Sequence, residues 1–408
     1  MDWNFLIKNK SSLDVTTDSR KVTSGSIFVA LKGEHFDGND FVEQAKAQGA
    51  EYVICGENAL QELQDLARAW RRELGLPILA ITGTNGKTTT KELCAAVLKT
   101  KYNIYYTQGN LNNQLGVPLT LLSITRAHEM AIVEMGASHP GDIKELVEIA
   151  EPNYGLITNV GRAHLQGFGS FEGVMRTKAE LYDYLRAHGG FCFRNTDNPY
   201  LEQMAGDLRT VAYTTGTMPE GTHLVGAYNA ENVSAALRVG LYFGVAEPRA
   251  LAAIRAYIPS NNRSQLMQTE RNTLVVDAYN ANPTSMSAAI NAFCLSAKRS
   301  ISETVCQCNG LSGEAGHKTA CCFILGAMRE LGEYSALEHQ NIVNMLLERK
   351  AEKVLLVGNE YTATTAPYPI FQDVDALCDY LKQEPLSGYT VLLKGSRSNQ
   401  LEKVIPLL

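Results

Sequence analysis

The sequence predicts an α/β protein in which mostly parallel sheets are layered with helices. Apolar runs of strand length alternate with helical stretches almost throughout the 408 residues, which is the pattern of repeated strand–helix units. The length and a hydrophobic content of 45% allow two or three domains, each with a sizeable core. The strand-length runs also fall into two groups, which indicates two separate sheets.

The order of these runs predicts where the domains begin and end. A charged helix ends near "LGLP" at 74–77, and the first group of strands is expected at 77–82, 103–107, 130–135 and 154–160. A polar stretch at 257–265, which contains Pro259, precedes the second group, expected at 273–279, 321–326, 353–358 and 390–395. We therefore expect domains at 1–75, 76–260 and 261–408.

Composition argues against several classes of protein. A net charge of −6 and a pI near 5.8 disfavour a nucleic-acid partner, which normally requires a basic face. No segment reaches the ~18 apolar residues of a membrane span, and the start "MDWNFLIKNK" lacks the apolar core of a secretion signal. Nine cysteines are scattered, and Cys55, Cys94 and Cys192 lie in apolar surroundings, which suits reduced thiols. A cytoplasmic location is therefore expected.

The segment "ITGTNGKTTT", residues 81–90, joins an apolar strand to a helix through a glycine-rich turn. A common phosphate-binding loop has Gly, four free positions and Gly-Lys-Ser/Thr, whereas the first Gly here comes two residues late, at Gly83. Backbone N–H groups of such a turn and the positive end of the helix suit phosphate oxygens. Lys87 would then reach the outer phosphates, and Thr88 would offer a hydroxyl to Mg²⁺. A simple tight turn is the alternative, but it does not explain the Lys-Thr pair.

Three further side chains could carry chemistry near this loop. Glu134 ends the apolar strand at 130–135, and ligands of open α/β sheets bind outside the carboxyl ends of strands, so its carboxylate could hold Mg²⁺. His164 follows the strand at 154–160 in a glycine-containing loop, and Lys178 lies in the helical stretch "MRTKAELYDYL". The alternatives are a capping or solvated Glu134, a structural His164 and a solvated surface Lys178.

Three later segments carry polar side chains at predicted helix starts or strand ends. In "GAYNAENVSAAL", Asn229 and Asn232 are three residues apart and share a helix face, so both amides could meet a purine, although capping also explains Asn229. Asp277 lies at a strand end, in "VVDAYNANPTSM". Lys394 and Arg397 lie in a cationic turn, "LLKGSRSNQ", which suits a carboxylate ligand, with an exposed basic loop as the alternative.

Taken in order, seven segments resemble the Mur ligases of peptidoglycan synthesis. They are "GTNGKTTT", "GNLNNQLGVPLTLL", "EMGASHPGDI", "ITNVGRAHLQGFGS", "KAELYDYL", "DAYNANPTSM" and "LGAMRELGEYS". The N-terminal "TDSRKVTSGSIFVALKGEHFDGNDFVEQAKAQGA" matches as well, so the resemblance covers nearly the whole chain. No single motif decides it, but the ordered set is highly specific, and the late Gly is the normal form of the loop in this family.

The resemblance implies a fold and a reaction. It implies a central P-loop mononucleotide-binding parallel sheet, an N-terminal UDP-binding α/β domain and a C-terminal Rossmann-like α/β domain. The sequence is most similar to family members that use ATP to join D-Ala-D-Ala to UDP-N-acetylmuramoyl-tripeptide. ATP would phosphorylate the tripeptide carboxylate, and the dipeptide amine would attack the acyl phosphate. The third residue of the peptide, meso-diaminopimelate or L-Lys, stays open, and a monomer is expected.

The resemblance also implies roles for particular residues. The implied catalytic residues are Lys87, His164 and Lys178. Thr88 and Glu134 would hold one Mg²⁺, and His164 with a carbamylated Lys178 would serve a second. ATP would be contacted by Gly83, Thr84, Asn85, Gly86, Lys87, Thr88, Thr89, Asn229, Asn232, Arg263 and Asp277. The substrates would be bound by Ser19, Arg20 and Lys32 on the UDP side, by Asn110, Asn112, Asn113 and Asn282 on the muropeptide side, and by Lys394 and Arg397 at the dipeptide carboxylate.

One region departs from the family pattern, and two other functions are alternatives to the one that the resemblance implies. The segment 297–320 looks longer than expected and carries Cys306, Cys308 and His317, with Cys321 and Cys322 just after. Four Cys and a His could bind Zn²⁺, but a surface loop is favoured because the spacing is not C-x₂-C. A sister ligase that adds a diamino acid to UDP-muramoyl-dipeptide would carry Asp-Asn-Pro-Arg in its C-terminal domain, whereas the only "DNP" here, 197–199, precedes Tyr200. A non-catalytic binding protein would be expected to lose Lys87, Glu134, His164 or Lys178, and all four are present.

Overall fold

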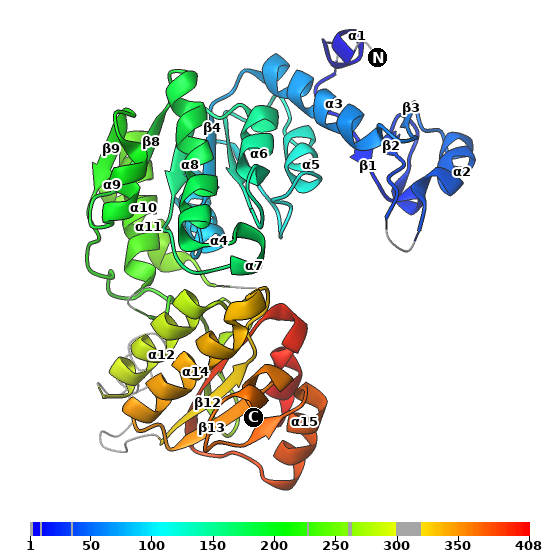
Figure 1. Cartoon of the computed structure of the whole chain (residues 1–408). Coiled ribbons are helices and arrows are strands. Elements are labelled where there is room, and N and C mark those ends of the chain that lie inside the picture. Colours follow the sequence, from blue (N-terminus) through cyan, green and yellow to red (C-terminus); the bar gives the residue numbers. More distant parts are fainter. Residues whose placement is uncertain (1–2, 9, 34–35, 227, 260–262, 299–319) are drawn as a thin grey trace.

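The computed structural model describes residues 3–8, 10–33, 36–226, 228–259, 263–298 and 320–408. These residues form three sheets with helices around them, and the sheets follow one another along the chain (Figure 1). Sequence reasoning from strand runs alone expected two sheets, and the family resemblance supplied the third, N-terminal one. The predicted α/β class with a central parallel sheet is confirmed.

The N-terminal sheet has three parallel strands in the order β1 (Val15–Thr16), β2 (Ile27–Val29) and β3 (Tyr52–Ile54). Side chains of β2 alternate between two faces, as in any strand. Phe28 packs with Ala45 of α2 (Val42–Ala47), whereas Ile27 and Val29 join a core that includes Trp3 of α1 (Trp3–Lys8). Two 3₁₀ turns, η1 (Ser19–Lys21) and η2 (Gly38–Phe41), complete the connections. The small sheet is thus covered on both faces.

Helix α3 (Ala59–Leu74) joins this sheet to the central domain (Figure 1). Its apolar side chains recur at helical spacing and are fully buried; they are Leu63, Leu66, Ala67 and Trp70. The Trp70 indole N–H donates to the Ile124 carbonyl at 2.8 Å, beyond the central helix α5 (Gly116–Leu122). The helix ends at Gly75, whose φ of 62° terminates it in the left-handed conformation. The buried face of α3 therefore shares one core with Trp3 and Ile27 on the N-terminal side and with Val117 on the central side.

The central sheet is fully parallel. Its strands, in spatial order, are β5 (Ile104–Tyr106), β6 (Met130–Glu134), β4 (Ile78–Thr82), β7 (Tyr154–Ile157), β8 (Phe191–Asn195) and β9 (Thr210–Tyr213). Ile81 of β4 pairs with Glu134 of β6, and Thr82 pairs with Ile157 of β7. The loops that leave these three strands therefore emerge side by side at the carboxyl edge, where ligands of such sheets bind.

Helices cover both faces of the central sheet. Ile78 and Ala80 of β4 face the core that contains α5, α6 (Asp142–Ala150) and α8 (Phe171–Ala187). Leu79 and Ile81 face the core that contains α4 (Lys87–Leu98), α10 (Asn229–Tyr242) and α11 (Glu247–Ala256). Two short helices, α7 (Leu165–Phe168) and α9 (Pro199–Ala205), lie in the connections. Burial of β4 on both faces explains its continuous apolar sequence.

The C-terminal sheet is mixed. In spatial order its strands are β10 (Gln265–Gln268), β11 (Thr273–Asp277), β15 (Tyr389–Lys394), β12 (Ala320–Gly326), β13 (Lys353–Val357) and β14 (Ile370–Phe371), with β10 antiparallel to β11 and the rest parallel. One face packs on α12 (Pro283–Lys298) and α14 (Ser335–Glu348). The other packs on α15 (Val374–Gln383) and the C-terminal 3₁₀ segment η6 (Leu401–Leu407). Asp277 and Lys394 end neighbouring strands and are partners in the register.

The C-terminal domain lies below the carboxyl edge of the central sheet in Figure 1. It contacts the loop that precedes α7 and also α7 itself. Arg162 donates its backbone N–H to Thr284 Oγ1 at 2.9 Å, and its guanidinium contacts Glu338 at 3.0 Å. The Gln166 N–H donates to the Glu330 carbonyl at 3.2 Å. These contacts close one side of the space between the two domains.

Several predictions of local structure need correction. All eight predicted strands are present, but those at 154–160 and 273–279 end earlier, at Ile157 and Asp277, where the chain turns into loops. Seven strands were not predicted: β1, β2, β3, β8, β9, β10 and β14. Three of these, β9, β10 and β14, include exposed or half-buried positions throughout, so their sequences lack a clear apolar pattern.

Of the three cysteines expected in apolar surroundings, two are buried and one is exposed. Cys94 and Cys192 are buried as expected, but Cys55 is exposed, because it directly follows the last residue of β3 at the surface. Residues 299–319 of the surface loop expected at 297–320, which include Cys306, Cys308 and His317, lie outside the described residues. Among the described helices, none is long and apolar enough to cross a bilayer.

Candidate active site

The loop between β4 and α4 is shaped by two glycines. Gly83 has a φ of 144° and Gly86 a φ of 78°, both in the region that favours glycine. A Cβ at Gly83 would collide with Thr158, and a Cβ at Gly86 with Asn232. The loop is further fixed because the Asn85 N–H donates to Asn159 Oδ1 at 3.0 Å. Helix α4 begins at Lys87, and the first N–H groups of a helix have no intrahelical acceptor, so they suit an anion.

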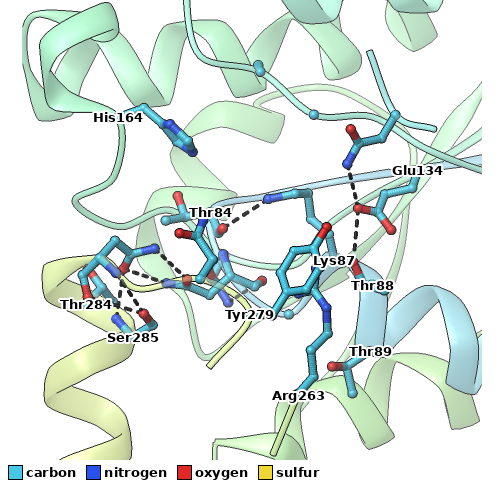
Figure 2. Close-up of a pocket in the computed structure, with 18 of the residues that line it drawn as sticks. Thr84, Lys87, Thr88, Thr89, Glu134, His164, Arg263, Tyr279, Thr284 and Ser285 are labelled. Atoms are coloured by element: carbon cyan, nitrogen blue, oxygen red, sulfur yellow. Dashed lines mark hydrogen bonds between the residues drawn. The ribbon is translucent and has the colours of Figure 1, made fainter. Parts of the chain in front are cut away.

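Lys87 folds back over this loop. Its ammonium donates to the carbonyls of Gly83 at 2.7 Å and Thr84 at 3.0 Å, and Figure 2 shows it pointing across the turn. Burial lowers the pKa of Lys87 to about 8, while Glu134 opposes this shift and Arg263 adds to it. The loop therefore presents a cation whose carbonyl partners could be exchanged for phosphate oxygens.

Glu134 lies almost completely buried beside this helix start, with an exposed fraction of 1%. Its Oε1 accepts hydrogen bonds from the Thr88 hydroxyl at 3.1 Å and from the Asn112 amide at 2.9 Å (Figure 2). Its Oε2 has no hydrogen-bond partner among the described residues, although it is buried. A buried carboxylate oxygen without a donor, next to a threonine hydroxyl, fits an oxygen-ligated Mg²⁺.

His164 reaches the same cavity from the loop after β7. It precedes α7 with a φ of 49°, and its Nδ1 contacts the Glu330 carboxylate of the C-terminal domain. Burial, with smaller contributions from the cations of Lys87 and Lys178, lowers the pKa of His164 to about 4. A neutral imidazole is the form that can ligate a metal.

Lys178 is buried rather than solvated, so the surface interpretation of this residue is wrong. It lies on α8 with an exposed fraction of 2%, and its Nζ lies 5.6 Å from the centre of the Phe168 ring. Burial, together with the charge of Lys87, holds the pKa of Lys178 well below its usual range. The side chain therefore carries an amine that is readily neutral.

Asn229 and Asn232 lie on one face of α10, as their spacing predicts. The Asn232 amide donates to Asn229 Oδ1 at 2.9 Å, and Asn232 Oδ1 accepts from Thr90 of α4 at 3.0 Å. Tyr228, not Asn229, occupies the N-cap position, and it makes no side-chain cap bond, so capping does not explain Asn229. The pair joins α10 to the phosphate-loop helix and lines the cavity.

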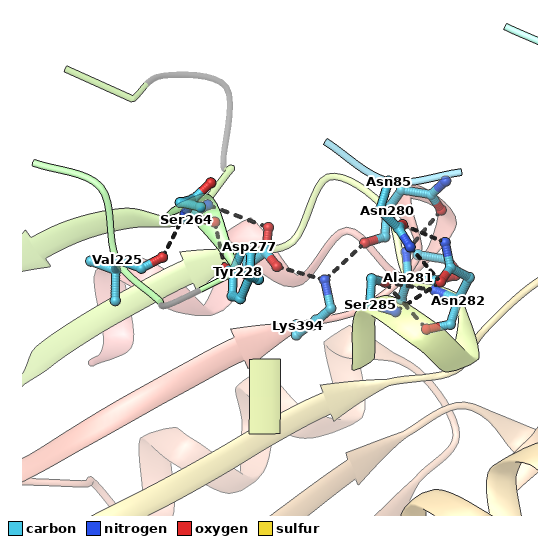
Figure 3. A network of polar contacts seen from close by, with 12 residues as sticks. Asn85, Val225, Tyr228, Ser264, Asp277, Asn280, Ala281, Asn282, Ser285 and Lys394 are labelled. Carbon is cyan, nitrogen blue, oxygen red and sulfur yellow. Dashed lines mark hydrogen bonds and ion pairs between the residues drawn. The ribbon is translucent and has the colours of Figure 1, made fainter. Parts of the chain in front are cut away.

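The C-terminal domain contributes a second polar group, shown in Figure 3. Lys394 is buried, and its ammonium pairs with the Asp277 carboxylate at 2.6 Å, so it is no exposed loop residue. Asp277 Oδ1 also accepts the Ser264 N–H at 3.3 Å, and the Ser264 hydroxyl contacts the Tyr228 hydroxyl of the central domain at 2.6 Å. The Arg263 guanidinium stacks over the Tyr279 ring at 3.7 Å.

Two further asparagine side chains that line the cavity, Asn113 and Asn282, are held by hydrogen bonds. Asn113 Oδ1 accepts the N–H groups of Leu115 and Gly116, at 3.2 and 2.9 Å, and so fixes the start of α5. Asn282 of the C-terminal domain donates its amide to Asn85 Oδ1 at 2.8 Å. This bond brings the phosphate loop and the start of α12 together.

One cavity of about 910 Å³ unites these groups. Of the sequence-predicted residues it is lined by Thr84, Asn85, Gly86, Lys87, Thr88, Thr89, Asn110, Asn112, Asn113, Glu134, His164, Asn229, Asn232, Arg263, Asp277, Asn282 and Lys394. It does not include Gly83, Lys178, Ser19, Arg20, Lys32 or Arg397. Gly83 and Lys178 are buried behind it; Arg397 pairs with Glu402 at 2.9 Å, and Arg20 pairs with Asp18 in the N-terminal domain.

Sequence reasoning missed several cavity residues. Asn159, Tyr279 and Glu330 line it, and each lies inside a motif that carried the family resemblance, in "ITNV", "DAYN" and "MREL". The motifs therefore held the signal, but the roles depend on contacts between distant segments. Within the described ranges, no cluster of three His, Cys, Asp or Glu side chains could hold a metal alone. A metal here would need phosphate oxygens or a modified side chain as further ligands.

The fold and the cavity define a P-loop mononucleotide-binding protein of three α/β domains. Residues 14–100 match the description "Mur ligase family, catalytic domain", and residues 81–219 match "Mur ligase middle domain". The chain belongs to the Mur ligase family.

Relatives and solved structures agree over nearly the full length. The chain is 33% identical to the UDP-N-acetylmuramoyl-tripeptide–D-alanyl-D-alanine ligase of Bacillus subtilis, covering 96% of this chain and 92% of the relative. It is 31% identical to the ligase of the same name from Escherichia coli, covering 97% and 93%. It is also similar to a crystal structure of MurF from Acinetobacter baumannii, with 27% identity, a TM-score of 0.80 and coverage of 96% and 92%. A MurF ligase from Thermotoga maritima in complex with ADP is 25% identical, with a TM-score of 0.81 and 97% coverage of both chains.

Proposed function

We propose that this chain is an ATP-dependent ligase that joins D-Ala-D-Ala to UDP-N-acetylmuramoyl-tripeptide in peptidoglycan precursor synthesis. The observation that carries the proposal is full-length similarity to ligases with this name, together with a phosphate loop and a buried carboxylate in one cavity. The substrates are cytoplasmic nucleotides and a small dipeptide, so we place the enzyme in the cytoplasm, without a membrane or nucleic-acid partner and as a monomer.

The reaction needs an activated carboxylate. The tripeptide carboxylate attacks the γ-phosphorus of ATP, ADP leaves, and the acyl phosphate then accepts the dipeptide amine, which releases phosphate and forms the amide. In such a reaction the protein mainly positions the partners and balances charge. Lys87 would leave the carbonyls of Gly83 and Thr84 and hold the outer phosphates, because its ammonium already lies over the loop.

The residues at the phosphate loop fit a Mg²⁺ ion. Thr88 and Glu134 would hold it, since the hydroxyl and the carboxylate already lie 3.1 Å apart and Glu134 Oε2 lacks a donor among the described residues. When bound, the ion neutralises charge that develops on the phosphate oxygens. His164 would serve a second ion.

Lys178 supports the second ion if it is carbamylated. Carbamylation requires an amine without its proton, and burial next to Lys87 favours that form. The reaction joins the Lys178 nitrogen to CO₂ and releases a proton, so a cation becomes an anion. A carboxylate on this buried helix face would extend the donor set toward His164.

The remaining predicted contacts divide between nucleotide and substrates. Asn229 and Asn232 would face adenine, and Arg263 and Asp277 would approach the nucleotide from the C-terminal domain. Asn110, Asn112, Asn113 and Asn282 would line the muropeptide, with Ser19, Arg20 and Lys32 near uridine. Lys394 and Arg397 would bind the dipeptide carboxylate, although Lys394 is paired with Asp277 and would have to share or exchange that partner.

The test is phosphate release from ATP with Mg²⁺ and UDP-N-acetylmuramoyl-tripeptide, with and without D-Ala-D-Ala. We expect release that requires both substrates, and a UDP-linked pentapeptide detected by mass. Release stimulated instead by a free diamino acid on the UDP-dipeptide would establish the sister ligase. No stimulation by any acceptor would overturn the ligase proposal.

A further inference from the structure

A buried cation, Lys91, lies next to the proposed metal site and has no role in the reaction described above. It lies on α4 one helical turn after Lys87, with an exposed fraction of 0%. Its ammonium donates to the Thr107 carbonyl at 2.7 Å and contacts Glu92 Oε1 at 3.1 Å. Its distance to Glu134 Oε2 is 3.7 Å. A lysine is almost never buried completely unless its charge is balanced.

The two oxygens of Glu134 have different partners. Oε1 accepts hydrogen bonds from Thr88 and Asn112, whereas Oε2 has no hydrogen bond among the described residues and faces the charge of Lys91. A buried carboxylate without a counter-charge is strongly unfavourable, so a cation beside Oε2 stabilises the empty site. The same cation repels any dication that binds to Oε2, because both charges are positive and a buried setting screens their repulsion only weakly.

We propose that Lys91 is the counter-cation of Glu134 and that its charge sets the affinity of the site for divalent ions. Before metal binds, Lys91 balances the carboxylate; after metal binds, its charge lowers the affinity, so that the metal and ADP can leave. The inference rests on the proposed metal role of Glu134, but it does not depend on which peptide or acceptor the enzyme uses. The structural alternative is that Lys91 only ties α4 to β5 through the Thr107 carbonyl.

The experiment measures Mn²⁺ binding to the full chain with saturating ADP, from the electron paramagnetic resonance signal of free Mn²⁺. Lys91→Met keeps the length of the side chain and removes its charge, and we expect Mn²⁺ to bind about tenfold more tightly. Lys91→Arg keeps the charge and should stay within about twofold of the wild type. An unchanged or weaker affinity in folded Lys91→Met would overturn the proposal.

Two controls separate this inference from the metal assignment. Glu92→Gln removes the other carboxylate that contacts Lys91, and we expect a Mn²⁺ affinity within about twofold of the wild type, because Glu92 does not line the cavity. Glu134→Gln should weaken Mn²⁺ binding strongly. If it does not, the metal role of Glu134 is wrong, whatever Lys91 does.

A stability measurement covers the case in which Lys91→Met does not fold. Removing one member of a buried charge pair is costly, whereas replacing both members by neutral groups is much less so. The double variant Lys91→Met/Glu134→Gln should therefore regain a cooperative thermal unfolding transition. A double variant as unfolded as Lys91→Met would show that Lys91 acts only through Thr107, and it would overturn the counter-cation role.

Discussion

The two walls of the cavity are held together in different ways. The central wall is fixed within one domain: Thr88 and Asn112 both donate hydrogen bonds to Glu134, which is 1% exposed. The opposite wall belongs to another domain and reaches the first through contacts such as Arg162–Glu338, in which the Arg162 side chain is 60% exposed. Under the proposed function, the half that would bind phosphate is therefore preformed, whereas the half that would bind the acceptor depends on where the C-terminal domain lies.

The largest expected effect breaks the preformed half. Lys87→Ala removes the one ammonium that folds over the phosphate loop, and we expect ligase turnover to fall by at least about a hundredfold. Because the lysine bonds only to loop carbonyls, thermal unfolding should hardly change. Lys99→Ala, on the exposed end of the same helix, is the matched control and should keep its activity. Full turnover in Lys87→Ala would remove the phosphate role from this loop.

A smaller effect is expected at Lys178, which is proposed to be carbamylated. Lys178→Ala should lower turnover by about tenfold to a hundredfold, and added formate or acetate should restore much of it, since a small carboxylate can occupy the space of the carbamate. Turnover is measured against carboxylate concentration at constant ionic strength. If no carboxylate rescues the variant, Lys178 acts as an unmodified buried amine.

The pH dependence of nucleotide binding sharpens the comparison further. The pKa of Lys87 in the free enzyme is about 8, lower than that of an ordinary lysine, so the ammonium is lost as pH rises through 8. ADP affinity, measured by calorimetry from pH 7 to 9.5, should weaken by up to about tenfold per pH unit above that value. Between pH 8 and the pKa of the unfolded chain, the unfolded state binds more protons, so this lysine makes the protein more stable as pH rises.

Lys87→Met is the control for this dependence. The variant should show neither the loss of ADP affinity nor the gain in stability in that pH window. An identical pH profile in the wild type and in Lys87→Met would assign the titration to another group.

The smallest effect concerns the wall that depends on domain placement. Arg162→Ala removes an ion pair between the domains in which Arg162 is exposed and the Glu338 side chain is only 6% exposed, and even fully exposed pairs contribute ~0.2–1 kcal/mol. We expect the KM for D-Ala-D-Ala to rise about twofold to fivefold, with little change in ADP binding, because the phosphate half stays intact. An equal loss of ADP affinity would show that both walls form together.

Much of the fold follows from local sequence, because strands buried on both faces are continuous apolar runs. This is why β4, β6, β12 and β15 were predicted, whereas the edge strands β9, β10 and β14 were not. The boundary expected near residue 75 coincides with the end of α3, but it does not reveal what α3 packs against. That helix packs against both the N-terminal sheet and the central domain, which only tertiary contacts reveal.

The candidate site likewise contains residues that local sequence predicts and residues that depend on contacts between distant segments. The phosphate loop could be predicted, because its glycines and Lys-Thr pair have local physical reasons. The surface alternative for Lys178 is wrong, and Val174, Leu181 and Leu185, which share its helix face, could have shown from the sequence that this face is buried. The pairing of Lys394 with Asp277 was beyond local reasoning, since it joins strands that lie far apart in the sequence.

Gly83 and Gly86 have a consequence for how this enzyme could change under selection. Every other amino acid carries a Cβ, and at both positions that atom would collide with a neighbouring side chain while the backbone stays in a glycine conformation. Any substitution at either position would therefore strain the backbone and force a neighbouring side chain to move. An inhibitor that contacts only the backbone of these two residues would therefore meet a surface from which resistance by direct substitution cannot readily arise.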